Sequence, residues 1–500
     1  MRSQRRPVAA LCSVAFLASC GAKEIPREDW GAITPDAELR VTTVSGAEHE
    51  MTRVTAFTDR LEGAVEVREG ALVDSVTIRI PLDSIDFVET RSGNAAWPVL
   101  TALAATATTI MIINARGKSD VEPPPTAVGS CPFIYSFDGN EYRLDSETFA
   151  GAITRGLART DLDNLEQLRA VDGLYRMRLA NERPETQHTD ELTLRVVDHP
   201  AGTTVLPDRD GEPRVLVDAT GPRAATGLRG ADVLAQVMAQ DDVFWQGDPV
   251  FTIDETDPSS FRDGVELIFP RPASDRGLLS VRAQNTTLAP FVLERFLELF
   301  GEDLTEWYRR VDRDPALQSE LKEWIRREGM LHVSVWVGDG WVRQAALPDV
   351  GPHLPKSQVA ELDLAGVEGD VVRVRLEVPR GLWSFDHIGL GTESTASPVV
   401  TEVRAMEAFD GEGRDVAPRL METDGSHVTA LPGHTVDLVF QAPPDPPAGN
   451  ERTVLARTHG FYHIWVEQSG TAQLDQVERI LREPGYVNRY MLELFRGTIQ

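Results

Sequence analysis

The sequence predicts a mainly β protein with a small SH3-like or Sm-like barrel, a hydrophobic helix, and a large jelly-roll-like β-sandwich region with a helical insertion. Three observations predict this architecture. Short runs that alternate apolar and polar residues recur over 38–92, the pattern of half-buried strands. A stretch without charge, 95–115, separates them from a longer series of alternating runs that begins at 131. Within that series, 291–327 carries apolar residues at helical spacing.

Length and charge limit the function classes. The 500 residues suffice for about three or four domains of ordinary size. Fifty basic residues against seventy-eight acidic ones give a formal net charge of −28. A surface this acidic repels phosphate backbones, so nucleic acid is not expected as a partner.

Residues 1–19 have the pattern of a signal peptide. Three arginines lie among the first six residues, and the apolar segment 8–18 follows, too short to span a bilayer. The sequence "LASC" at 17–20 resembles the lipobox of bacterial lipoproteins. The resemblance implies that Cys20 is lipidated, becomes the new N-terminus and anchors an exported protein to a membrane of the cell envelope. The alternative is an ordinary signal peptide with a chance cysteine.

The next segments are a tether at 20–37, the barrel at 38–92 and the hydrophobic helix at 95–115. The helix is long enough to cross a hydrocarbon core of roughly 30 Å at about 1.5 Å per residue. Its richness in Ala and Thr leaves a second possibility, a helix packed against protein. The proline-rich segment 116–130 is predicted to be a linker.

The chain after 130 is divided into a β-sandwich region, 131–398, and a β-rich C-terminal segment, 399–500, that ends in one or two helices. The sequence "FIYSFDGNEYRLD" contains two alternating runs around "DGN", which predicts a hairpin. The helical insertion at 291–327 is predicted to contain two or three helices.

Several stretches resemble a region that recurs in large, uncharacterised bacterial envelope proteins. They are "CPFIYSFDGNEYRLDSE" with the following "RTD", then "VVDHP", and later "GLWSFDHIGL". The resemblance covers roughly 130–465 and implies a β-sandwich surface module. The resemblance implies no catalytic, cofactor-binding or metal-binding residue, and the sequence itself identifies none.

Cys131 is the only cysteine beyond the first twenty residues. A reactive thiol needs a basic neighbour or a helix N-terminus, and the local sequence offers neither. Cys131 is therefore predicted to be a small buried residue at the start of a strand.

Four other patterns are candidate sites. His459 and His463 lie four residues apart, which places both on one face of a strand, without a nearby third metal ligand. Two acidic groups suggest calcium ligands but lack the EF-hand spacing, so solvated turns are favoured. They are Asp161, Asp163 and Glu166 in one group, and Asp208, Asp210 and Glu212 in the other. The tryptophans of a possible sugar-stacking platform are Trp336, Trp341, Trp383 and Trp465.

The sequence favours a non-catalytic module that binds a protein or glycan of the envelope or serves in assembly. One alternative is a hydrolase of envelope polysaccharide, which would need two convergent carboxylates about 5–10 Å apart in a cleft. The other is a purely structural membrane anchor.

The lipobox gives a direct prediction. Replacing Cys20 (Cys20→Ala) should release or misprocess the protein, because acyl chains contribute about 0.8 kcal/mol of membrane affinity per buried methylene. Detergent-phase partitioning and mass spectrometry of the N-terminal peptide measure this. Unchanged partitioning with no lipid on the peptide would refute lipidation.

Overall fold

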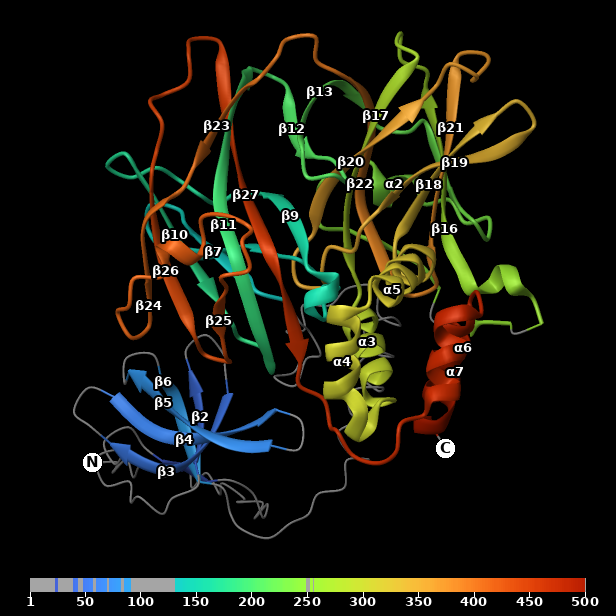
Figure 1. The fold of residues 1–500 in the computed structure, drawn as a ribbon. Coiled ribbons are helices and arrows are strands. Elements are labelled where there is room, and N and C mark those ends of the chain that lie inside the picture. Colours follow the sequence, from blue (N-terminus) through green and yellow to red (C-terminus); the bar gives the residue numbers. More distant parts are fainter. Residues whose placement is uncertain are drawn as a thin grey trace, which may run out of the picture. The chain divides into compact units, whose positions relative to one another are not determined.

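The computed structural model describes strand segments within 23–90 and residues 131–248, 252–254 and 256–499 (Figure 1). It is mainly β, as predicted, and divides into two compact units, which are described separately. The leader 1–19 with Cys20, the predicted helix 95–115 and the predicted linker 116–130 lie outside the described residues. In the described part of the chain, no helix is long and apolar enough to cross a membrane.

The first unit is a six-stranded sheet in the order β1-β6-β2-β3-β4-β5, barrel-like as predicted. Its strands are β1 (Lys23–Ile25), β2 (Leu39–Thr43), β3 (Glu48–Ala56), β4 (Arg60–Glu69), β5 (Leu72–Pro81) and β6 (Ile85–Thr90). Leu39, Val41 and Val88 lie in its core. The predicted tether, 20–37, contains the short strand β1, which pairs with β6.

The second unit contains two β-sandwiches. The first sandwich packs two sheets, ordered β24-β26-β10-β7-β8 and β23-β11-β27-β9, with β25 paired to β11. The strands of the first sheet are β7 (Phe133–Phe137), β8 (Tyr142–Glu147), β10 (Leu174–Ala180), β24 (Ala405–Asp410) and β26 (Thr435–Gln441). Those of the second are β9 (Arg159–Asn164), β11 (Glu185–Pro200), β23 (Val399–Val403), β25 (Val428–Ala430) and β27 (Asn450–Ile464). The predicted "DGN" hairpin is β7–β8.

The second sandwich also has two sheets, ordered β12-β13-β22-β17-β20, with β15 on β22, and β14-β16-β21-β18-β19. The strands of the first are β12 (Thr204–Pro207), β13 (Pro213–Thr220), β15 (Trp245–Gln246), β17 (Arg276–Asn285), β20 (Lys356–Asp363) and β22 (Trp383–Glu393). Those of the second are β14 (Ala224–Gly227), β16 (Arg262–Pro270), β18 (Leu331–Val337), β19 (Gly340–Leu347) and β21 (Val371–Pro379).

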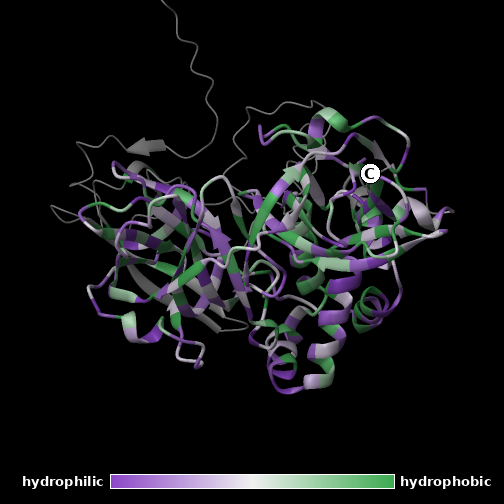
Figure 2. Cartoon of the chain, turned by 90° about the horizontal axis from the view of Figure 1, so that it is seen from above, coloured by the Kyte–Doolittle hydropathy of each residue, from purple (hydrophilic) through white to green (hydrophobic). Residues whose placement is uncertain are grey.

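Alternation along the strands builds both cores. In the first sandwich Leu192, Leu194 and Val196 of β11 face the interior while the residues between them face away. In the second, Val372, Val374 and Leu376 of β21 are fully buried. Figure 2 shows hydrophobic and hydrophilic residues alternating along the strands of both sandwiches.

Helices occur at the two predicted places in the chain and pack against the second sandwich. The insertion between β17 and β18 contains α3 (Leu288–Glu298), α4 (Leu304–Arg313) and α5 (Pro315–Glu328). The C-terminal pair is α6 (Leu474–Arg482) and α7 (Tyr486–Ile499), and a short α2 (Leu234–Val237) follows β14. Asp314 starts α5 by accepting a hydrogen bond from the Ala316 amide at 2.9 Å. Phe296, Trp307 and Trp324 pack into the core of the second sandwich.

The path of the chain links the sandwiches twice. It leaves the first sandwich after β11 and returns at β23, so strands of the predicted C-terminal segment, 399–500, complete the sheets of the first sandwich. The departure near 200–204 was not predicted. Figure 1 shows the sandwiches side by side. Between them lies a small apolar cluster in which Leu162 and Leu455 of the first sandwich meet Val205 and Val215 of the second.

Gly264 lies where β16 packs closely on β21, and replacing it tests that packing. Gly264 has φ = +150°, and a Cβ there would lie 1.9 Å from the carbonyl oxygen of Leu376. We expect Gly264→Ala to cost more than about 4 kcal/mol of unfolding free energy, because backbone would have to move. Gly369 is the matched control: its φ is +83° but nothing lies within 4 Å, so Gly369→Ala should cost only about 1 kcal/mol. Urea unfolding measures both, and equal costs would contradict the packing argument.

Candidate ligand site between the two sandwiches

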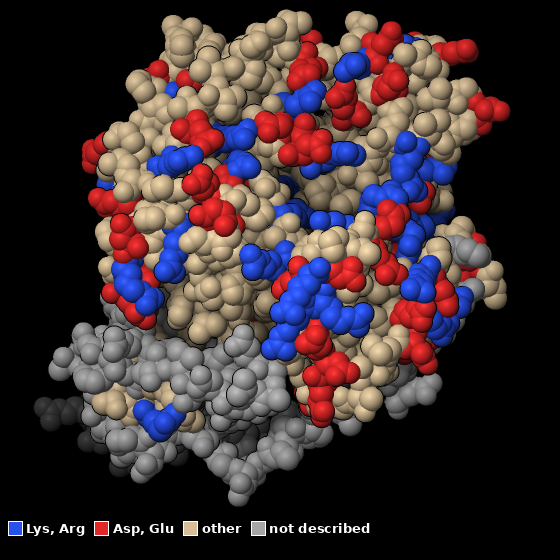
Figure 3. Space-filling model, in the orientation of Figure 1, with Lys and Arg blue, Asp and Glu red and all other residues tan. Residues whose placement is uncertain are grey.

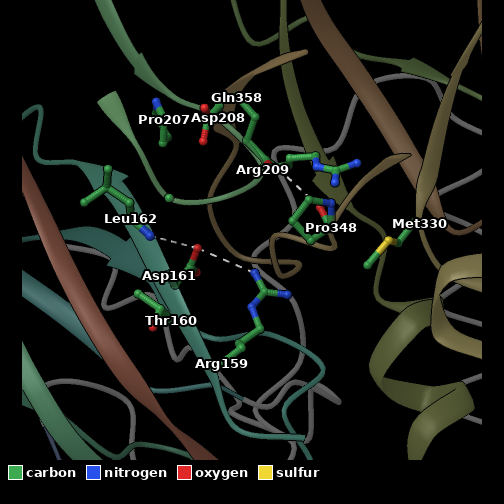
Figure 4. A pocket seen from close by; sticks show the side chains of 11 residues that line it. Arg159, Thr160, Asp161, Leu162, Pro207, Asp208, Arg209, Met330, Pro348 and Gln358 are labelled. Carbon is green, nitrogen blue, oxygen red and sulfur yellow. Dashed lines mark hydrogen bonds and ion pairs between the residues drawn. The ribbon is translucent and has the colours of Figure 1, made fainter. Parts of the chain in front are cut away.

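A cavity of about 210 Å³ lies at the junction of the two sandwiches (Figure 4). β9 of the first sandwich forms one wall, and the β12–β13 turn, Met330, Pro348 and β20 of the second form the others. The residues that line it are Arg159, Thr160, Asp161, Leu162, Pro207, Asp208, Arg209, Gly211, Met330, Pro348 and Gln358. Figure 3 shows a hollow between the two sandwiches with basic side chains near it.

Arg159 is held firmly at the cavity wall. Its Nη1 donates to the Ala150 carbonyl oxygen and to Asp349 Oδ1, both at 3.0 Å. Its Nη2 lies 3.5 Å from Asp161 Oδ1. Burial acts to lower the pKa of Arg159, but Asp161 and Asp349 outweigh it and raise that pKa. The guanidinium is therefore charged, oriented and already neutralised by protein carboxylates.

Lys356 joins the two sandwiches behind this wall. It lies at the start of β20, its side chain is only 4% exposed, and its Nζ is 2.8 Å from Asp161 Oδ1 on β9. Asp163 Oδ2, two residues further along β9, is 3.8 Å from the same Nζ. Because alternate residues of a strand share a face, both carboxylates converge on one ammonium group.

The two carboxylates have opposite acid–base character. Burial acts to raise the pKa of Asp161, but Lys356 and Arg159 lower it overall. Burial raises the pKa of Asp163 to about 7, with Lys356 opposing the rise, and Asp163 also accepts a hydrogen bond from Ser146 Oγ at 2.7 Å. A pair with its pKa values pushed apart is typical of an acid–base site and also occurs in structural ion networks.

The acidic groups considered for calcium differ from each other in the structure. Asp161 and Asp163 lie on a strand and pair with Lys356, so the solvated turn favoured for them is wrong. Asp208 does form a turn between β12 and β13, accepting hydrogen bonds from the amides of Asp210 at 2.9 Å and Glu212 at 3.0 Å. The fold brings Asp161 and Asp208 to the same cavity. Among the residues that the structure describes, no three metal-ligating side chains form a metal site.

Cys131 is buried, as predicted, and lies away from the cavity lining. Its amide donates to Glu185 Oε1 at 3.0 Å. Burial, followed by the nearby Glu147 and Glu185, raises the pKa of the thiol well above its ordinary value. A thiol that stays protonated is a poor nucleophile.

Glu147 and Glu185 are themselves buried acids. Burial raises the pKa of Glu147 to about 8, opposed by the hydrogen bond that its Oε2 accepts from the His353 amide at 2.8 Å. Burial likewise raises the pKa of Glu185 to about 7, opposed by the hydrogen bond from Gln187, whose Nε2 lies 2.7 Å from Glu185 Oε1. Both carboxyls therefore hold their protons to higher pH in the folded chain than in water.

The two histidines on β27 contact different residues and do not form one site. His459 Nδ1 lies 2.5 Å from Asp190 Oδ1, whereas the His463 ring packs against Tyr308 of α4 with centroids 4.4 Å apart. Burial lowers the pKa of His463 to about 4. The two imidazoles thus have separate structural partners.

The four tryptophans do not form one platform. Trp383 is a core residue that donates to the Gly329 carbonyl oxygen at 2.8 Å, and Trp465 donates to Thr186 Oγ1 at 2.9 Å. Trp336 and Trp341 pack edge to face on the β18–β19 hairpin.

The sequence missed Arg159, Asp349 and Lys356 as members of one cluster. Arg159 lies 190 residues before Asp349 in the chain, and no local motif links it to Asp349 and Lys356. One weak signal existed: Lys356 is one of four lysines among fifty basic residues, in a chain that otherwise uses arginine.

No family model matches the chain, and a comparison with curated proteins finds no match. The resemblance to bacterial lipoproteins and envelope proteins therefore stays a prediction.

The buried glutamates predict a dependence of stability on pH. Between about pH 4 and 8 the unfolded chain releases the proton of Glu147 while the folded chain keeps it. This carboxyl therefore contributes a loss of stability as pH rises, at most about 1.4 kcal/mol per pH unit. Glu147→Gln removes that ionisation, so the variant should gain on the parent as pH rises through this window.

Unfolding free energies at several pH values, measured with denaturant, check this. Glu368→Gln, which removes one exposed carboxylate, controls for the change in net charge. A difference between Glu147→Gln and the parent that stays constant from pH 5 to pH 8 would contradict the prediction.

Proposed function

We propose that this chain is an exported bacterial lipoprotein, anchored to an envelope membrane through Cys20, and that it acts as a non-catalytic binding module. The predicted helix 95–115 would add a second attachment if it inserts. The ligand site is the junction cavity, and the favoured ligand is one sugar residue of an envelope glycan.

One observation carries the proposal: the charged wall of the cavity is fixed by ion pairs. Arg159 is bonded to Asp349, and Asp161 is bonded to Lys356. Groups that are already paired and oriented cost little entropy when a ligand binds beside them. Such groups are suited to ligand binding and not to catalysis, because their protons and charges are already held in ion pairs within the protein.

The size and lining of the cavity favour a small polar ligand. Its volume, about 210 Å³, is below the roughly 300–1,000 Å³ of ordinary small-molecule pockets, so a single ring is the expected occupant. Arg209 and Gln358 offer hydrogen-bond donors, while Leu162 and Met330 offer apolar surface. A sugar ring presents both hydroxyl groups and apolar C–H faces, which matches this lining.

The alternative function, hydrolysis of envelope polysaccharide, is supported by the convergent Asp161 and Asp163. Their pKa values move in opposite directions, as for an acid and its partner carboxylate. Two features weigh against it. Lys356 contacts both carboxylates, and Asp163 is not part of the cavity lining.

Binding to a set of bacterial envelope saccharides, measured by calorimetry with the full-length protein in detergent, tests the proposal. Arg209→Ala should weaken binding about tenfold, the loss of roughly one charge-assisted hydrogen bond. The only ion pair of Arg209 in the described structure is to its neighbour Asp210, so folding should be intact. Arg276→Ala, which removes an exposed arginine outside the cavity, is the matched control and should bind normally.

Three results would contradict the proposal. Saccharide binding that is insensitive to Arg209→Ala would place the ligand elsewhere. Cleavage of a saccharide that Asp163→Asn abolishes would establish the hydrolase instead. Failure to bind any saccharide would leave the purely structural anchor.

A further inference from the structure

A second surface, outside the cavity, is rich in tryptophan and arginine and has no part in the proposed function. It is the outward side of the sheet β14-β16-β21-β18-β19, and we call it the tryptophan–arginine face. Its residues are Glu266, Ser334, Trp336, Trp341, Arg343, Arg373 and Arg375. None of them lines the junction cavity, so the inference does not depend on the proposed ligand there.

Strand register places these residues in adjoining rows. Trp336 lies directly opposite Trp341, and Ser334 opposite Arg343, across the β18–β19 hairpin. Arg375 is flanked by Ser334 on β18 and by Glu266 on β16. Their neighbours along the strands, such as Val335 and Val374, are fully buried, so the rows point away from the core.

The aromatic and guanidinium groups are stacked on one another. The two indole rings meet edge to face with centroids 5.3 Å apart. The Arg373 guanidinium lies 4.7 Å from the Trp336 ring centroid, and that of Arg375 lies 4.3 Å from the Trp341 centroid. These cation–π contacts hold the long side chains in place, which lowers the entropy cost of binding a ligand.

Positive charge exceeds negative charge in these rows. Arg375 Nη2 lies 2.6 Å and Arg373 Nη2 3.6 Å from the carboxylate of the same residue, Glu266, so two guanidinium groups share one anion. Arg343 adds a third guanidinium and is exposed. Figure 3 shows basic side chains gathered over this part of the molecule. On a chain with a net charge of −28 this is a local region of the opposite sign.

We infer that the tryptophan–arginine face binds an acidic polysaccharide, one that carries carboxylates on its sugar rings. Guanidinium groups pair with carboxylates in a planar, bidentate way, and indole rings pack on the apolar faces of sugars. A peptide ligand fits less well, because added peptide strands pair with a sheet edge, whereas most of these side chains lie across the middle of the sheet.

Affinity electrophoresis of the full-length protein in detergent tests the inference, with sodium polygalacturonate as the acidic polymer and dextran as the neutral one. Polygalacturonate should retard the protein, less so at higher salt, and dextran should not. The double variant Arg373→Gln/Arg375→Gln should bind polygalacturonate at least tenfold more weakly. Arg178→Gln/Arg195→Gln removes two arginines from strands of the first sandwich and is the charge-matched control.

A second variant guards against loss of folding. Ser334→Glu keeps every cation–π contact and places a carboxylate beside Arg375, so it should weaken binding to a similar extent while leaving thermal unfolding near that of the parent. No retardation, or equal retardation of the parent and both variants, overturns the inference. Binding to phosphatidylglycerol vesicles that is lost in these variants, without binding to the polymer, also overturns it and makes the face a membrane contact.

Discussion

The buried ion pair between Lys356 and Asp161 is the interaction on which the junction of the two sandwiches depends. Both side chains are almost fully removed from water, and each charge would be costly without the other. Removing one partner of such a pair typically costs about 3–5 kcal/mol, because the remaining charge is stranded. Since one partner is on β9 and the other on β20, the sandwiches can close only in the arrangement that brings them together.

That arrangement explains the position of the cavity. Arg159 precedes Asp161 by two residues on β9, so the strand that supplies the buried anion also supplies the cation at the cavity wall. Asp349, which holds Arg159, lies between β19 and β20 and therefore belongs to the second sandwich. The network thus fixes one wall against the other, and a rigid hollow remains where the apolar cluster around Leu162 ends.

The two candidate binding surfaces differ in their electrostatics. At the cavity, acids and bases are paired within the protein, so hydrogen bonding and shape govern what is held there. On the tryptophan–arginine face, Glu266 alone is shared by Arg373 and Arg375, so net charge selects the ligand. Both properties suit a module that binds without chemistry, and they allow a neutral sugar and an acidic polymer to be held independently.

The sequence by itself determined the local structure. Alternation predicted the strands, "DGN" predicted the β7–β8 hairpin, and helical spacing predicted α3 to α5 and the C-terminal helices. These features depend on which side of a segment is apolar, and the spacing of apolar residues along the sequence shows this.

Only the tertiary structure decided which surfaces meet. Periodicity does not reveal which element packs against a given face of β9. The sequence therefore predicts a solvated acid at Asp161, whereas in the structure β20 brings Lys356 to it. Likewise Trp383 and Trp336 both lie in predicted strands, and only the packing of the sheets makes Trp383 a core residue and leaves Trp336 on an outer face. The division into two sandwiches was hidden because strands distant in the chain, such as β11 (Glu185–Pro200) and β27 (Asn450–Ile464), pair in the same sheet.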